Sequence, residues 1–418
     1  MSEWREVALG EVLDIKHGYA FRGEHFGLGG CNRLVTPGNF YEGGGFRDRG
    51  ALQKSYDGPL PGEYVLSPGA LIVAMTEQSP GLLGSSGLVP HDGFQWLHNQ
   101  RIGLVKPLHA EADERFIYSL FNDPSVRGQI SATASGTKVR HTSPGRLKSV
   151  RVRMPSIGTQ RHIAAVLSAF DELIEINERR IEVLEELARS LYREWFVRFR
   201  FPGHAAVDFT DSDVGPLPEG WRVAAFAAIG EFLNGYAFKP SHWGDEGIPI
   251  IKIKELKQGV TTATPRYGGV DLESRYFVEP GDLLFSWSAD LGVYLWAGER
   301  GALNQHLFKV SPTAGIGRAY LYYSLEAALP RFRSRAQGTT MKHIKRSALM
   351  EVDCVLPDQV LQAAFSETVG PMHEEVLTLK NEVAMLAATR DLLLPRLVTG
   401  RLDISEIDLG ALLPAEAA

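Results

Sequence analysis

Two stretches of the chain combine many positively charged side chains with an absence of acidic ones. The first runs from Arg127 to Arg161 and the second from Arg331 to Arg346. Lys and Arg side chains attract phosphate groups, so two such stretches at matching places suit two contacts with a nucleic-acid backbone. The residues we expect to contact phosphates are Lys138, Arg140, Arg146, Arg331, Arg333, Lys342, Lys345 and Arg346.

Polar and aromatic residues in the predicted loops have the chemistry needed to read base edges. Arg and Lys suit guanine, and Asn and Gln suit adenine. A competing interpretation of the basic stretches is a solvated surface, or an intramolecular partner for acidic residues elsewhere. The recurrence of the basic stretch favours nucleic acid. The candidate base readers are Arg47, Thr76, Gln78, Asn99 and Gln100, followed by Lys252, Lys254, Ser286, Trp287, Asn304 and Gln305.

Motifs for catalysis are missing from the sequence. It contains no Walker loop, no zinc-protease histidine spacing, no adenine-methyltransferase Asn-Pro-Pro-Tyr motif and no Gly-X-Ser-X-Gly elbow. An enzyme that acts on its own is therefore disfavoured, and we expect neither a catalytic residue nor a bound metal or cofactor in this chain. The alternative of a fused methyltransferase or nuclease with an unrecognised site stays open.

Composition limits the class of protein further. The 418 residues allow two or three domains, with 44% hydrophobic and 22% charged residues as in ordinary globular proteins. The two cysteines, Cys31 and Cys354, exclude a disulfide framework. The first residues lack a secretory signal pattern and no run of about 18 apolar residues occurs, so we expect a cytoplasmic location. The net charge of −6 means that binding to nucleic acid must depend on local charge.

The chain repeats itself. Gly18-Tyr19-Ala20-Phe21 recurs as Gly235-Tyr236-Ala237-Phe238, and Trp4 recurs as Trp221 at the same separation. Asn99-Gln100 matches Asn304-Gln305, and Gln160 matches Gln362. Residues that choose a sequence should differ between two repeats that read different half-sites. The repeated Gly-Tyr-Ala-Phe and Asn-Gln segments are therefore interpreted as shared scaffold.

Each repeat has a mixed part followed by a helical part. Short apolar runs bounded by Gly and Pro predict strands in residues 1–155 and 221–357, and helices are expected at about 112–122 and 318–328. The fold class is thus α+β. The full assignment is a recognition domain at 1–155, a central helix at 156–200, a linker at 201–220, a second recognition domain at 221–357, a second helix at 358–400 and a tail at 401–418.

The helical parts carry heptad patterns. In the first, apolar residues recur every seven positions in two tracks from Ile163 and Leu167, with one polar interruption at Asn177. The second pattern starts at Phe365 and Val369 and is less regular. Gly370-Pro371 should kink or split that helix, Arg390 lies on its apolar track, and Pro395 should end it. Two such helices in one chain most simply pack on each other, although they could instead be core helices of two separate globular domains.

These features give the chain a resemblance to the specificity subunits of type I restriction-modification systems, over nearly its whole length. No single string carries the resemblance, which depends on the order of the strings and on the repeat. They are the paired Gly-Tyr-Ala-Phe segments, Pro155–Ala164, Trp195–Val197, Gly215–Trp221 and Leu393–Gly400.

The resemblance implies two target recognition domains separated by two long antiparallel helices, each domain reading half of a split site in double-stranded DNA. It also implies that two methyltransferase subunits dock on the helices, whose outer faces carry Glu175, Glu178, Glu182 and Glu185, and that two restriction subunits with translocase activity join them. S-adenosylmethionine, ATP and Mg²⁺ would then be bound by those other subunits. Two further alternatives remain: a two-domain scaffold that binds only proteins, and the recognition subunit of a type II-like system.

Overall fold

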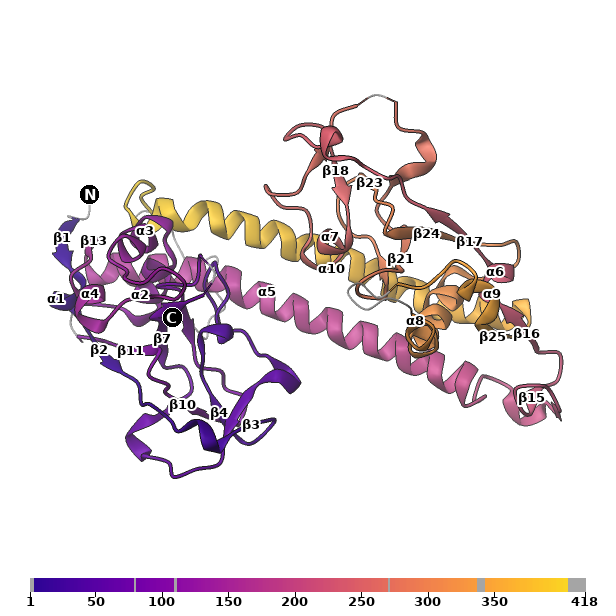
Figure 1. Ribbon diagram of the computed structural model, residues 1–418, viewed down its shortest axis with the longest axis horizontal. Helices are drawn as coiled ribbons and strands as arrows, with labels where there is room; N and C mark the ends of the chain where they lie inside the picture. Colours follow the sequence, from indigo (N-terminus) through magenta and orange to yellow (C-terminus); the bar gives the residue numbers. More distant parts are fainter. Residues whose placement is uncertain (1–3, 79, 109–110, 270, 337–342, 405–418) are drawn as a thin grey trace. The chain divides into compact units, whose positions relative to one another are not determined.

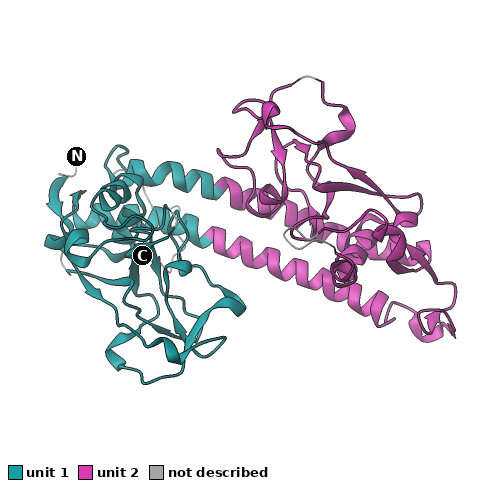
Figure 2. Ribbon diagram, viewed as in Figure 1, with its two compact units in different colours: residues 1–172, 386–418 teal, residues 173–385 magenta. Residues whose placement is uncertain are grey.

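The computed structural model describes residues 4–78, 80–108, 111–269, 271–336 and 343–404. The chain divides into two compact units, and each of its two long helices is divided between them (Figure 2). The first unit combines Met1–Glu172 with Leu386–Ala418, and the second is Leu173–Met385. Each unit therefore contains one predicted recognition domain together with part of both long helices.

The first domain is built on a four-stranded antiparallel sheet in the order β2-β11-β7-β9. Every side chain of β7 is buried, as expected for a short apolar run between turn residues. Strand β11 pairs with β2 on one side and β7 on the other. The bounds are β2 Leu13–His17, β7 Leu71–Ala74, β9 Ser86–Leu88 and β11 Ile102–Pro107.

A second sheet extends the same domain in the order β3-β5-β4-β10-β6, with β4 and β10 parallel. Two short ladders complete the domain, β1 with β13 and β8 with β12. The bounds are β3 Phe26–Leu28, β4 Asn32–Leu34, β5 Lys54–Tyr56, β6 Val65–Leu66 and β10 Gln95–Leu97, then β1 Arg5–Ala8, β13 Arg151–Met154, β8 Thr76–Glu77 and β12 Arg140–His141.

Helices cover the first sheet and enclose the main core of the unit. Asp113 caps one of them, since its carboxylate accepts a hydrogen bond from the Phe116 amide at 2.9 Å. The core includes Phe116, Leu147 and Ile163 from this part of the chain and Leu397 from its far end. The bounds are α1 Leu9–Val12, α2 Glu114–Asn122, α3 Pro124–Ala132 and α4 Pro144–Lys148.

The second domain repeats this topology, which confirms the duplication predicted from the sequence. Its first sheet has the order β17-β24-β21-β22, and its second sheet, β19-β18-β23-β20, again contains one parallel pair, β18 with β23. The bounds are β17 Gly230–Asn234, β21 Leu283–Ser286, β22 Gly292–Leu295, β24 Leu307–Pro312, β18 Ile248–Ile251, β19 Arg266–Tyr267, β20 Phe277–Val278 and β23 Gly301–Leu303.

The remaining elements of the second domain also have counterparts in the first. Strand β16 pairs with β25 as β1 pairs with β13. A short ladder, β14 with β15, lies in the predicted linker. The bounds are β14 Phe209–Thr210, β15 Leu217–Pro218, β16 Arg222–Ala225, β25 Asp353–Leu356, α6 Phe226–Ile229, α7 Ile253–Gln258, α8 Arg318–Ser334 and α9 Ala348–Glu351.

Two long helices, α5 (Ile157–Tyr192) and α10 (Gln359–Val398), confirm the heptad prediction (Figure 1). A π-helical turn, Arg193–Val197, follows α5. Every predicted seam residue of both helices is buried or half-buried. Contacts of the two helices within the second unit run antiparallel, since Asn177 bonds Glu382 while Arg180 pairs with Glu375.

Two expectations for the second helix, a split at Gly370-Pro371 and an end at Pro395, were wrong. It continues through Gly370-Pro371 as one helix, and it continues past Pro395 to Val398. A proline inside a helix removes one backbone hydrogen bond, which packing along a long helix can offset. Gly400, two residues beyond the last helical residue, terminates the helix with φ of +72°. Its amide bonds the Leu397 carbonyl at 3.1 Å, and the Arg401 amide bonds the Arg396 carbonyl at 2.8 Å, a Schellman motif.

Candidate nucleic-acid interface

In the first domain the predicted DNA-contacting residues lie on loops that are hydrogen-bonded to one another. Strand β12 pairs with β8 so that Arg140 lies opposite Glu77 and His141 opposite Thr76. The loop that carries Arg47 joins the same group, because the Gly45 amide donates to the Ser86 carbonyl at 2.8 Å. We call these segments the first loop cluster: residues 40–47, Thr76–Gln78, Pro80–Ser86 and 135–142.

Glu77 holds the first loop cluster together. Its side chain is only 3% exposed. Its Oε2 accepts hydrogen bonds from the backbone amides of Gly81, Leu82 and Leu83 at 3.0, 3.0 and 2.9 Å. Its Oε1 accepts a hydrogen bond from Arg140 Nη1 at 3.0 Å. One buried carboxylate therefore fixes both the loop after β8 and the strand that carries Arg140.

Two further side chains brace the first loop cluster from α2 and α3. The Arg127 guanidinium donates to the carbonyls of Glu42 and Gly81, and burial lowers the pKa of this guanidinium. Asn122 accepts a hydrogen bond from the Ser86 amide at 3.0 Å and lies against Gly44. Arg127 thus has a structural role. Neither Glu77 nor Asn122 was a candidate from the sequence, because nothing in a single sequence distinguishes a buried acid or amide from an exposed one.

The charges of the first basic stretch divide into paired and outward-facing groups. Arg140 is half-buried and bonded to Glu77, and two later members pair with acids, Lys148 with Asp14 and Arg151 with Glu6. Lys138 and Arg146 are exposed, and Arg146 donates to the Ser135 hydroxyl at 2.9 Å. Among the other candidates, Arg47 and Gln78 are exposed and Thr76 is half-buried.

The second domain has a corresponding arrangement around Trp287, the residue after β21. The Ile344 amide donates to the Trp287 carbonyl at 3.0 Å, as the Thr142 amide donates to the Met75 carbonyl at 2.9 Å in the first domain. The indole N–H of Trp287 donates hydrogen bonds to Asn234 Oδ1 at 3.2 Å and to the Gln305 carbonyl at 3.1 Å. Trp287 therefore presents at most its ring face to a ligand.

Helix α7 and the end of α8 lie beside the same turn. Lys257 of α7 pairs with Asp290, and this hydrogen bond raises the pKa of Lys257. Arg333 of α8 donates to the Leu291 carbonyl at 3.0 Å. The second loop cluster thus comprises residues 252–258, 287–291, Arg333 and 343–346. Its candidates include Lys252, whose ammonium lies 4.7 Å from the centre of the Trp243 ring, and Lys254, which is exposed.

The remaining candidates of the second basic stretch differ in their surroundings. Burial raises the pKa of Tyr192 and of Cys354, and the charge of Arg331 opposes both shifts. Arg331 therefore lies near Tyr192 of α5 and Cys354 of β25. Arg346 donates to the Phe232 carbonyl at 3.4 Å, and Lys345 is exposed. Lys342 lies outside the described residues.

The repeated Gly-Tyr and Asn-Gln segments are scaffold, as the sequence predicted. The Tyr19 amide donates to the His98 carbonyl at 2.8 Å, and the Tyr236 amide donates to the Leu303 carbonyl at 2.8 Å. A Cβ on Gly18 or Gly235 would collide with the backbone carbonyl of Asn99 or Asn304. Only glycine allows this close approach of two segments.

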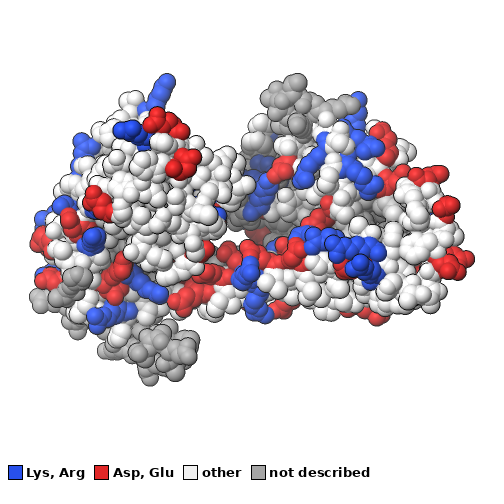
Figure 3. Space-filling model, turned by 90° about the horizontal axis from the view of Figure 1, so that it is seen from below, with Lys and Arg blue, Asp and Glu red and all other residues white. Residues whose placement is uncertain are grey.

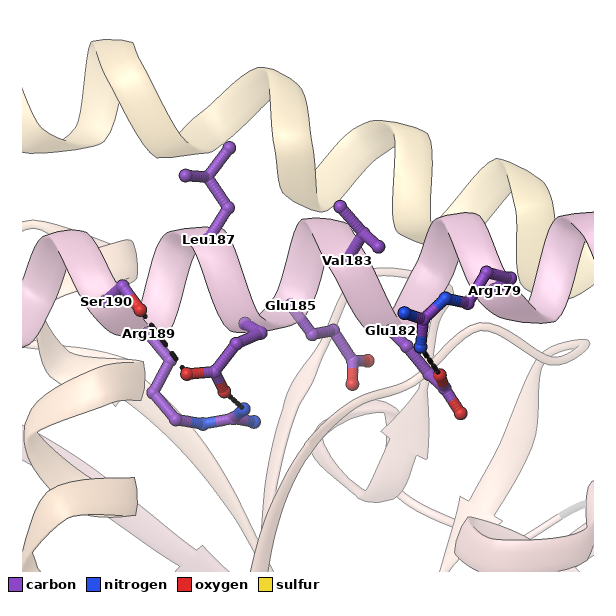
Figure 4. A pocket seen from close by; sticks show the side chains of 8 residues that line it. Arg179, Glu182, Val183, Glu185, Leu187, Arg189 and Ser190 are labelled. Carbon is purple, nitrogen blue, oxygen red and sulfur yellow. Dashed lines mark hydrogen bonds and ion pairs between the residues drawn. The ribbon is translucent and has the colours of Figure 1, made fainter. Parts of the chain in front are cut away.

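The long helices offer a surface of a different kind. A surface cavity of about 520 Å³ lies along α5, lined by residues from Arg179 to Ser190. In Figure 4, Val183 and Leu187 leave the helix on the side opposite to Glu182, Glu185 and Arg189. Apolar residues Leu173, Ile176, Val183 and Leu187 are 48%, 55%, 52% and 47% exposed.

The acidic residues of α5 do not form a single-sign surface. Glu182 pairs with Arg179, Glu185 with Lys380, and Glu186 with Arg189. Figure 3 shows acidic and basic side chains interspersed on the face in view. The helices therefore combine half-exposed apolar residues with ion pairs.

Within the described parts of the chain, no group of three or more His, Cys, Asp or Glu residues is placed to hold a metal ion. None of the described helices is long and apolar enough to cross a membrane.

Comparison with known proteins connects the whole arrangement to one family. A family model described as the type I restriction modification DNA specificity domain matches residues 1–186 and 218–368. The chain is 24% identical over 302 residues to the type I restriction enzyme MjaIX specificity subunit of Methanocaldococcus jannaschii, covering 70% of each protein. It is 22% identical over 338 residues to the HindI specificity subunit of Haemophilus influenzae, covering 65% of this chain and 73% of that protein.

A solved structure shows the same fold. The S subunit of a type I restriction-modification system from M. genitalium superposes with a TM-score of 0.61 at 17% identity, and the match covers 97% of both chains.

Proposed function

Since the chain belongs to the type I restriction-modification DNA specificity family, we propose that it reads a DNA site in two parts, one part with each domain. The observation that carries this proposal is that the two domains share a scaffold and differ in their loops. Strands β7 and β9 correspond to β21 and β22, yet residues 75–85 join the first pair while only residues 287–291 join the second. Two readers on one scaffold with different loops suit two different half-sites.

The residues divide by chemistry into phosphate contacts and base contacts. Lys138, Arg146, Lys254 and Lys345 are exposed cations and would contact phosphates. Arg47 and Gln78 in the first loop cluster, with Thr76 beside them, have side chains suited to base edges. In the second loop cluster Lys252 and the ring face of Trp287 would have this role.

The long helices would dock the catalytic partners. Half-exposed apolar residues surrounded by ion pairs are typical of protein interfaces. We propose that two methyltransferase subunits bind there and that two restriction subunits with translocase activity join the complex. S-adenosylmethionine, ATP and Mg²⁺ would be bound by those subunits, and this chain would supply recognition without catalysis.

A methylome tests the proposal directly. The chain is co-expressed with its methyltransferase partner in a host without methylation, and modified bases are mapped by single-molecule sequencing. We expect methyladenine in a two-part motif with a fixed gap, absent when this chain is omitted. A soluble complex that gives no motif would contradict the proposal and favour a protein scaffold.

Domain exchange tests the assignment of one half-site to each domain. Residues 1–155 are replaced by the first recognition domain of another specificity subunit. The new motif should differ from the original in one half only. A change in both halves would contradict modular reading.

A further inference from the structure

The connection between the last two strands of the main sheet differs in length between the two domains, eleven residues (75–85) in the first and five (287–291) in the second. In the second domain a short turn, residues 287–291, joins β21 to β22, and Ala289 adopts φ of +58° within it. In the first domain residues 75–85 make the same connection, and they carry the short strand β8. The connection lies at the end of a pair of strands that both domains share, and loops on a shared scaffold are natural sites for divergence.

A buried acid orders the longer connection. Glu77 accepts three backbone hydrogen bonds from Gly81–Leu83 with one oxygen and pairs with Arg140 through the other. Four hydrogen bonds to one buried carboxyl group leave it little freedom, so they fix the path of the loop. Arg127 adds a hydrogen bond to the Gly81 carbonyl.

This brace contributes more to loop geometry than to overall stability. Removing a carboxylate and a guanidinium from water costs about as much as their attraction returns. The second domain makes the corresponding connection, residues 287–291, without an acid at the position of Glu77. Ala289 occupies that position. The Glu77–Arg140 pair is therefore explained best by the conformation that it imposes.

The conformation displays the candidate base reader. Gln78 follows Glu77 directly and is exposed, and Lys138 is exposed on the neighbouring segment of the first loop cluster. We propose that the loop after β8, described at Gln78 and Pro80–Ser85, reads bases of the first half-site, and that Glu77 is the residue that positions it. This inference rests on the proposed function above. The amide of Gln78 would bond the edge of an adenine.

The test uses the complex of this chain with its methyltransferase partner and four variants, of which the fourth is Arg140→Lys. Glu77→Ala removes the carboxylate. Glu77→Gln replaces one of its oxygens with an NH₂ group, which then faces either the backbone amides of Gly81–Leu83 or the Arg140 guanidinium, both of which are donors. The control is Glu6→Gln, which alters an exposed glutamate of the same unit that also pairs with an arginine, Arg151. Binding is measured to duplexes with the intact site, with the first half-site scrambled and with the second half-site scrambled.

Both Glu77 variants should lose about tenfold or more of the discrimination against a scrambled first half-site. Their discrimination at the second half-site should stay within about twofold of wild type, because that half-site belongs to the other domain. Their binding to unrelated duplexes and its salt dependence should not change, since phosphate contacts remain. The Glu6→Gln complex should match wild type in every measurement.

Two results would overturn the inference. One is retention of first half-site discrimination in both Glu77 variants. The other is retention of that discrimination in Arg140→Lys, which keeps the charge of the pair and is the deciding variant if both Glu77 variants lose discrimination at both half-sites through general unfolding. If the wild-type complex itself discriminates at neither half-site, the proposed function fails and this inference falls with it.

Discussion

Asp171 on α5 and Arg390 on α10 form an ion pair of 2.7 Å within the first unit. Arg390 occupies a position on the apolar seam of its helix, and the pair explains how a charge is accommodated there. Burial raises the pKa of Asp171, and the hydrogen bond from Arg390 opposes that shift. Asn177 and Glu382 make a comparable polar contact of 3.1 Å in the second unit. The two polar exceptions in the heptad pattern are therefore contacts between the long helices.

Replacing Arg390 with Met should lower the free energy of unfolding of the first unit by about 1–3 kcal/mol, because Asp171 would lose its partner in a partly buried site. Adding Asp171→Asn should recover most of the loss. The measurement is urea unfolding followed by tryptophan fluorescence. The control is Arg5→Met, which breaks an exposed pair with Glu111 and should cost less than about 1 kcal/mol. Equal effects of the two substitutions would contradict the role given to Arg390.

Gln160 joins the start of α5 to the first domain through three hydrogen bonds. Its side chain accepts from the Asp113 amide at 2.9 Å and donates to the carbonyls of Glu111 and Pro155 at 2.9 and 3.0 Å. Gln362 makes two corresponding bonds at the start of α10, accepting from the Gly317 amide and donating to the Pro357 carbonyl, both at 3.0 Å. This shared anchor explains why the two glutamines recur in the sequence.

Gln160→Ala should therefore destabilise the first unit by about 2–4 kcal/mol, because buried backbone groups lose their partners. Hydrogen exchange should accelerate at the start of α5 and in the segment before α2. Gln129→Ala is the control, since that exposed amide makes a single bond to the Arg151 carbonyl. If the two variants are equally stable, the anchor is not important.

Glycine substitutions should have opposite effects at two positions of the first domain. Gly18→Ala places a methyl group against the backbone carbonyl of Asn99 and should cost about 2 kcal/mol or more. Gly128→Ala lies inside α3 with no atom within 4 Å of the added carbon and should add about 0.5–1 kcal/mol. Thermal unfolding of the two variants measures both changes. A stabilising Gly18→Ala would mean that the two segments do not approach so closely.

A buried histidine should make stability sensitive to mild acid. His373 bonds the Tyr323 hydroxyl at 3.0 Å, and burial lowers its pKa to about 4, helped by the charges of Arg318 and Lys380. Between pH 6.5 and about 4 the unfolded imidazole binds a proton that the folded one does not. Stability is therefore lost as the pH falls, by up to about 1.4 kcal/mol per pH unit.

His373→Gln should flatten this dependence, and urea unfolding at several pH values measures the difference from wild type. His98 in the first unit, whose pKa burial also lowers to about 4, provides a parallel test. A pH dependence identical to that of wild type in His373→Gln would mean that the imidazole is accessible to protons in the folded state.

Lys138 and Arg140 should behave differently although they are two residues apart. Lys138→Ala should weaken binding to all duplexes and reduce the slope of log affinity against log salt by about 0.9, the effect of one phosphate contact. Arg140→Ala should change the slope less, because Arg140 is engaged by Glu77. Fluorescence anisotropy at several salt concentrations measures both slopes. An unchanged slope for Lys138→Ala would remove Lys138 from the phosphate contacts.

The sequence predicted the large-scale organisation because its signals were repeated. The duplication and the heptads each depend on many residues, so single irregularities such as Pro371 did not obscure them. The effect of Pro371 and Pro395 on α10 was misjudged because tertiary packing outweighs local preference in a long helix. The interpretation of Gly18 and Asn99 as scaffold was possible because both residues recur in the second repeat. The structure confirmed it, since both copies make the same close backbone contact.

Details of the candidate interface were harder to predict. Charge can be read from a sequence, but pairing cannot, and Arg140 and Lys148 bind acids that are distant in the chain, Glu77 and Asp14. Glu77 was not recognised because its importance depends on burial and on three amides that come after it. The assignment of individual residues to bases and phosphates stays a prediction.

The division of the helices between the units has a consequence for synthesis. Leu397, Val398 and Ile404 belong to the core of the first unit together with Val7 and Leu9. During translation the residues up to Glu172 leave the ribosome early. The remaining residues of this unit, from Leu386 onward, follow only after the whole second unit, 173–385, has been synthesised. The domain that is translated first therefore completes its core last. Until the end of α10 is synthesised, the apolar residues that pack against it stay exposed.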